Sequence, residues 1–126
     1  MYGYTNKITL SFEEADKKVR EELQKEGFGI LTEIDIQATL KKKLDVDLEK
    51  YTILGACNPP YAHKALLAEK EIGLLLPCNV IIYQNNDKVN VSAILPTRAM
   101  SIVDNPKLVK IAEEIEAKLK KVIDSL

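Results

Sequence analysis

The sequence has few of the residues from which most catalytic and metal sites are built. Its 126 residues include one histidine, two cysteines and no tryptophan. No site made of several His or Cys ligands can therefore come from one chain. A serine triad or a Cys-His dyad could use only His63, and two thiols cannot by themselves complete a tetrahedral zinc site. A metal would need His63 or a second subunit as well.

The chain also lacks an excess of charge of one sign. Eighteen basic and nineteen acidic residues leave a net charge of −1. Binding to a nucleic-acid backbone by bulk electrostatics is therefore not expected. No apolar run reaches the roughly 18 residues of a membrane-spanning helix, and the N-terminus has no signal-peptide pattern. We expect a cytoplasmic protein with no membrane partner, in which both cysteines are normally reduced.

The remaining composition is that of an ordinary folded domain. Apolar residues make up 46% and charged residues 29% of the chain. A chain of this length buries roughly two-thirds of its unfolded surface as one domain. With no internal repeat and no linker, residues 1–126 are predicted to form a single domain.

The spacing of apolar residues predicts alternating strands and helices. Ser11 and Glu14 form a capping box that predicts the start of the first helix. Gly27 can adopt the left-handed conformation that commonly ends a helix. The last helix carries an apolar stripe from Leu108 to Leu126 at helical spacing. The predicted strands span residues 3–10, 28–36, 51–57, 74–83 and 88–95. The predicted helices span residues 12–26, 37–44, 58–70 and 105–126.

Three local features refine these boundaries. Alternation from Phe28 to Ile36 predicts a strand with one buried face. Asn58 before two prolines predicts a helix start that the asparagine caps. Pro77 cannot donate to a sheet, so a bulge or the first turn of the strand is expected there.

These elements predict an α+β fold of two layers, with a mostly antiparallel sheet and helices on one face. The other face would be covered only in part, although it carries Ile81, Tyr83 and Ile94. An apolar surface of this kind suggests a partner. We therefore expect a homodimer in which a second copy completes the core.

Two segments resemble a known family. They are Gly55–Leu66, with the sequence GACNPPYAHKAL, and Ile72–Val80, with the sequence IGLLLPCNV. Both resemble the bacterial and archaeal domain of unknown function 302 family, and the outer elements match in placement. The resemblance implies a β-α-β(4)-α layered fold that commonly forms a dimer. It implies no reaction and no catalytic residue.

The same segments hold the candidate site residues. Cys57 directly precedes the helix that begins at Asn58, where free N–H groups and the helix dipole favour an anion or a thiolate. The other interpretation of Cys57 is a small apolar side chain at a tight junction. Cys78 and Asn79 repeat the Cys-Asn pair at the end of another strand, so the two pairs could meet at one end of the sheet.

His63 completes this predicted pocket. Its imidazole could bind a haem iron or accept a hydrogen bond; otherwise it is a surface residue of the helix. The sequence thus predicts a ligand-binding module for a small anion or haem, with the cofactor itself left open. Two alternatives remain: an enzyme that uses the Cys57 thiol, and an interaction domain without small-molecule chemistry. The predicted ligand-binding residues are Cys57, Asn58, His63, Cys78 and Asn79.

Overall fold

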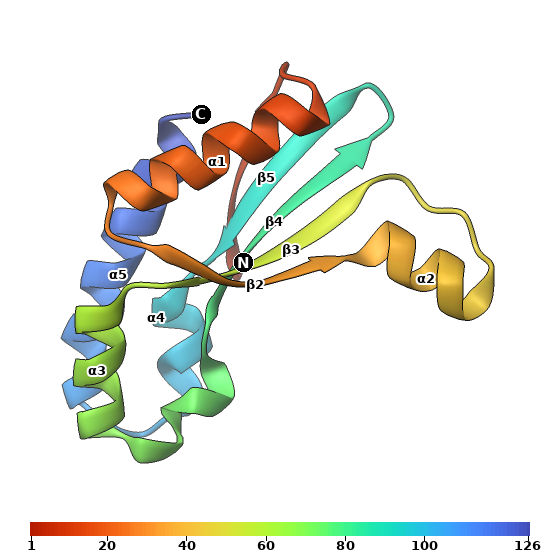
Figure 1. The fold of residues 1–126 in the computed structure, drawn as a ribbon. Helices are drawn as coiled ribbons and strands as arrows, with labels where there is room; N and C mark the ends of the chain where they lie inside the picture. The colour runs from red at the N-terminus through yellow and green to blue at the C-terminus, as the bar shows by residue number, and fades with distance from the viewer.

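The computed structural model describes residues 1–126 and confirms the predicted α+β fold. A five-stranded antiparallel sheet has the strand order β1-β5-β4-β3-β2. Helices α1 and α5 lie across one face of it (Figure 1). The strands are β1 (Gly3–Ile8), β2 (Gly29–Asp35), β3 (Tyr51–Cys57), β4 (Cys78–Asn85) and β5 (Lys88–Ile94). The helices are α1 (Phe12–Lys25), α2 (Ile36–Leu44), α3 (Pro59–Ala68), α4 (Pro96–Ala99) and α5 (Lys107–Asp124), with 3-10 helices η1 (Lys70–Leu75) and η2 (Met100–Ile102). None of these helices is long and apolar enough to cross a membrane.

Helix α1 begins as its capping box predicts. The Ser11 hydroxyl accepts a hydrogen bond from the Glu14 N–H at 3.1 Å, and the Glu14 carboxylate accepts one from the Ser11 N–H at 3.2 Å. Ala15, Val19 and Leu23 of this helix are fully buried in the core against the sheet. Gly27 follows with a φ of 86°, a left-handed conformation that glycine adopts without strain. These local features fix where α1 begins and where it ends.

The main core lies between the sheet and helices α1 and α5. Ile115 and Leu119 of α5 lie in this core and are 1–3% exposed, as the stripe predicts. A second, smaller cluster joins α3, η1 and the start of α5 through Ala65, Ile72 and other buried residues. This cluster holds α3 and η1 against the start of α5, beyond one end of the sheet (Figure 1).

The prediction that β2 buries one continuous face is wrong. The register shifts between Ile30 and Thr32, where a β-bulge interrupts the alternation. Ile30 lies on the helix-covered face, whereas Thr32 and Ile34 lie on the opposite face, beside Gly55 and Ile53. An extra residue in one strand reverses the face of every later side chain.

The strand predicted from residue 74 starts later. Residues 70–75 form η1, the Leu76–Pro77 peptide bond is cis, and β4 begins at Cys78. Because proline has no N–H to donate, sheet pairing starts directly after it. The predicted helix to residue 70 correspondingly ends at Ala68, and the short helices over residues 96–102 were not predicted.

The sheet face away from α1 and α5 carries an apolar and aromatic surface. The rings of Tyr51 and Tyr83 stack across β3 and β4 with their centroids 5.5 Å apart. Ile53 and Ile81 pair beside them, and both are half-buried. We call the surface formed by Ile34, Tyr51, Ile53, Ile81 and Tyr83 the open face.

Candidate functional site

A cavity of about 270 Å³ lies where β3 ends and α3 begins. Its walls come from α3, the start of β2, the end of β3 and the segment that leads into β4. Ten of its twelve lining residues are apolar. The lining residues are Phe28, Leu31, Ala56, Cys57, Asn58, Ala62, Ala65, Leu66, Leu76, Pro77, Cys78 and Ile115. We call this the cysteine cavity.

Small side chains leave the space that forms the cysteine cavity. Ala56 of β3 and Ala62 and Ala65 of α3 line it, and a methyl group fills little of the gap between a strand and a helix. The two alanines of α3 lie three residues apart and so share one face of the helix. Leu31 and Leu66 also line the cavity but are 64% and 43% exposed, so they mark its opening.

Both cysteines reach this cavity as free thiols. Cys78 lies opposite Ala56 in the sheet and is 6% exposed. Burial, and secondarily the nearby Cys57, raise the pKa of the Cys78 thiol to about 11. Near neutral pH this thiol is therefore protonated, and the wall it forms is uncharged. Cys57, the last residue of β3, is half-buried.

Asn58 is the only lining residue whose side chain carries an amide, hydroxyl or charged group. It occupies the N-cap position of α3, as predicted, but its side chain does not cap the helix. Its Nδ2 instead donates to the Glu26 carbonyl oxygen at 3.0 Å, joining the start of α3 to the end of α1. A capping side chain bonds to the N–H of the second or third helical residue, and the second residue is Pro60. One of the two N–H groups to which the Asn58 side chain could bond as a cap is therefore missing.

The prolines also limit what the start of α3 offers an anion. Pro59 and Pro60 have no N–H, and the Ala62 N–H is bonded to the Asn58 carbonyl oxygen. At most the Tyr61 N–H is left to donate in the first turn. An anion site at a helix N-terminus normally uses several such groups. The structure thus offers little to support the anion interpretation of the sequence.

The structure does not bring His63 or Asn79 into the cysteine cavity. His63 is exposed on α3 and is absent from the cavity lining. Asn79 is exposed on β4 and lines a different cavity, together with Ile94 and Met100. Sequence reasoning missed the apolar walls, although Ala62, Ala65 and Leu66 form a recognisable stripe on α3.

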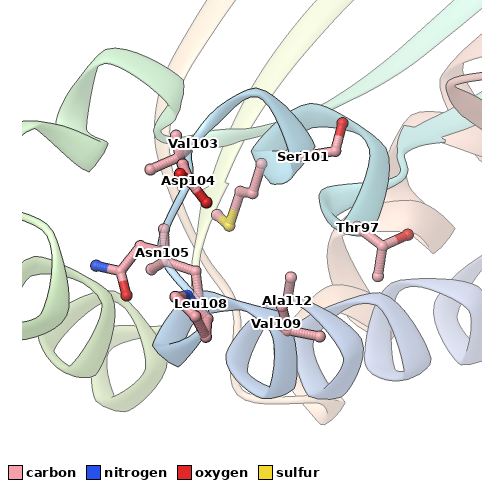
Figure 2. Close-up of a pocket in the computed structure, with 10 residues that line it drawn as sticks. Thr97, Ser101, Val103, Asp104, Asn105, Leu108, Val109 and Ala112 are labelled. Carbon is pink, nitrogen blue, oxygen red and sulfur yellow. The ribbon is translucent and has the colours of Figure 1, made fainter.

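A second hollow of about 330 Å³ lies between η2 and the first turns of α5 (Figure 2). Half of its ten lining residues are apolar. Its polar side chains mostly bond to the protein. Thr97 donates its hydroxyl to Glu116 at 2.6 Å, Ser101 donates to the Arg98 carbonyl oxygen at 2.6 Å, and Asn105 donates to Ala68 and Glu69. We call this the helical hollow.

Comparisons with known proteins agree with the fold. A family model described as "Domain of unknown function DUF302" matches residues 4–126. The crystal structure of an uncharacterized conserved DUF302 protein from Bacillus stearothermophilus is similar, with a TM-score of 0.93 and 30% sequence identity. The match covers 98% of this chain and 97% of that one. No curated protein matches the chain.

Proposed function

This chain belongs to the DUF302 family, and we propose that it is a binding module for a small, uncharged and largely apolar molecule, held in the cysteine cavity. One observation carries the proposal: ten of the twelve residues that line the cavity are apolar, and none of the twelve is charged. Small-molecule sites are typically concave and mostly apolar, with few polar groups.

The size of the cavity limits the ligand. Drug-sized ligands occupy roughly 300–1,000 Å³, and an apolar cavity of about 150 Å³ binds benzene. A volume of about 270 Å³ therefore suits a molecule of one or two rings, or a short aliphatic chain. Haem is larger than this, and His63, its predicted axial ligand, is not part of the lining.

The charge of the walls favours an uncharged ligand. Cys78 is protonated near neutral pH, and Asn58 carries no charge. An anion moved from water into this lining would lose its hydration without gaining a cationic partner. This argument favours a neutral apolar molecule over the small anion expected from the sequence.

A titration with toluene, followed by isothermal calorimetry, tests the proposal. We expect saturable binding to the wild-type chain. Ala62→Leu places a larger side chain in the cavity and is expected to weaken the affinity by at least about tenfold. Ala68→Leu is the matched control, because Ala68 is also half-buried on α3 but does not line the cavity. Equal losses in the two variants would contradict the proposal, as would failure to bind both toluene and a probe of similar size that carries a hydrogen-bond donor.

We also propose that the chain acts as a homodimer in which the open face packs against a second copy. The support is the composition of this face: its central strands present stacked tyrosines and paired isoleucines, without a charged residue among them. Symmetric dimers commonly use one self-complementary patch of this type.

Sedimentation at tens of micromolar tests the dimer. The wild-type chain is expected to sediment at twice its 14.1 kDa mass. Ile53→Glu, at the centre of the open face, is expected to give monomers, because it would bury unpaired charge at the interface. Val109→Glu, on the exposed surface of α5, should leave the dimer intact. A monomeric wild type at these concentrations would refute this part of the proposal.

A further inference from the structure

The Asn58 side chain has a hydrogen-bonding capacity that the protein does not use. The residue is 8% exposed and lines the cysteine cavity. Its Nδ2 has a partner in the Glu26 carbonyl oxygen, whereas its Oδ1 accepts no hydrogen bond from any other residue. A side-chain amide has two acceptor lone pairs on this oxygen. No fully buried polar side-chain atom of the protein lacks a partner, so Oδ1 keeps some contact with solvent. A donor on a ligand in the cavity can take the place of that solvent.

The amide is held in one orientation. Only Nδ2 can donate to the Glu26 carbonyl oxygen, so exchanging the positions of Nδ2 and Oδ1 would bring two acceptors together. The group also packs against Gly27, where an added Cβ would lie 3.3 Å from Nδ2. Gly27 has a positive φ, which also disfavours any larger residue there. The acceptor is therefore fixed before a ligand arrives.

We infer that the ligand of the cysteine cavity carries a hydrogen-bond donor on an otherwise apolar body, and that Asn58 selects for this donor through Oδ1. The inference rests on the proposed function and narrows its ligand class. Uncharged phenols, short alcohols and indoles belong to this class. Hydrocarbons of the same size lack the donor, and carboxylates would face the Asn58 oxygen with a negative charge.

Three probes of similar size test the inference at pH 7. Phenol has a donor, toluene has none, and benzoate is an anion. We expect phenol to bind about tenfold more tightly than toluene, which is the effect of one buried hydrogen bond. Benzoate is expected to show no saturable binding.

Two variants assign the selectivity to Asn58. Asn58→Leu removes the acceptor and should reduce the phenol-to-toluene affinity ratio to about one or below, while toluene affinity stays within about twofold. Loss of the bond to Glu26 alone would weaken both probes together, so the ratio separates selection from a structural role. Asn79→Leu is the matched control and should keep the wild-type ratio, because Asn79 does not line this cavity.

Each outcome has one interpretation. Selective binding of phenol that disappears in Asn58→Leu supports the inference. Equal affinity of the wild type for phenol and toluene overturns the role of Asn58 but leaves the apolar binding site intact. Failure of both probes to bind overturns the proposed function itself. If Asn58→Leu does not fold, the affinity ratio of the wild-type chain still decides whether a donor is preferred.

Discussion

The cysteine cavity and the helical hollow are similar in size but differ in how their polar groups are used. The hollow is the larger, at about 330 Å³ against about 270 Å³, and has more polar lining residues. Thr97, Ser101 and Asn105 in the hollow bond to other parts of the protein, whereas the Asp104 carboxylate forms no hydrogen bond or ion pair. In the cavity, the single amide of Asn58 keeps its acceptor free. The polar side chains of the hollow therefore mainly join elements of the fold, whereas the proposed ligand would use the free acceptor of Asn58.

The bonds around the helical hollow indicate a structural role. Asn105 links the start of α5 to the end of α3, and Thr97 links α4 to the middle of α5. They hold the short helices α4 and η2 against α5. We therefore expect changes in the hollow to affect stability, and changes in the cysteine cavity to affect ligand binding.

The largest expected effect on stability comes from replacing one leucine in each of the two regions by alanine. Leu108 in the hollow is 1% exposed, and Leu108→Ala should lower the free energy of unfolding by about 3 kcal/mol. Leu66 at the opening of the cavity is 43% exposed, and Leu66→Ala should cost less than about 1 kcal/mol. Toluene affinity should fall in Leu66→Ala and stay unchanged in Leu108→Ala. Urea unfolding and calorimetry measure the two effects, and the reverse pattern would break the comparison.

The pH dependence of the free energy of unfolding tests whether Cys78 is buried in the wall of the cysteine cavity. The pKa of Cys78 is about 11 in the folded chain against an ordinary 9.0. Between these values the unfolded chain loses the proton first, so stability is intact below pH 9 and falls as the pH rises towards 11. The expected loss is about 2–3 kcal/mol. Comparing Cys78→Ala with the wild type by urea unfolding at several pH values isolates this loss, and identical slopes would show that Cys78 is not buried as described.

A smaller effect is expected from the contact between α4 and α5. Thr97 donates its hydroxyl and its N–H to the Glu116 carboxylate, at 2.6 and 3.1 Å. Burial opposes ionisation of Glu116, but these bonds and Lys120 outweigh it and lower its pKa. Glu116→Gln should therefore cost about 1–2 kcal/mol, because charge-assisted bonds become neutral ones. Thermal unfolding measures the cost. Weakened toluene binding in this variant would show that the two regions are coupled.

The smallest effect is expected at His63. The residue is exposed and lines neither region. His63→Ala should change the free energy of unfolding by less than about 0.5 kcal/mol and leave toluene affinity unchanged. A clear loss of affinity in this variant would restore the pocket predicted from the sequence, in which His63 is a ligand-binding residue.

The sequence predicted the elements that depend on local patterns. The capping box at Ser11 and the stripe of α5 placed both helices of the main core, and the strand Tyr51–Cys57 was placed to the residue. The bulge after Ile30 was not predictable, because it depends on pairing with β3 and not on the alternation in β2. Likewise, Leu74–Leu76 are apolar enough for a strand but form part of a 3-10 turn and its exit.

The candidate site was predicted only in part. Cys57, Asn58 and Cys78 do line one cavity, as expected from their positions at strand ends. The sequence predicted a polar pocket, because that prediction rested on the polar residues alone and not on the alanines and leucines that also line the cavity. The direction of the Asn58 side chain depends on Glu26, which is 32 residues away, so spacing could not reveal it.

The most direct test maps where an apolar ligand binds. Phenol is titrated into ¹⁵N-labelled protein, and backbone amide shifts are followed by NMR. The account predicts saturable shifts around the cysteine cavity, at Ala56, Ala65 and Cys78, with little change at Met100 and Leu108 of the helical hollow. Saturable shifts confined to the hollow, or no saturable shifts at all, would contradict the claim that the cysteine cavity is the binding site.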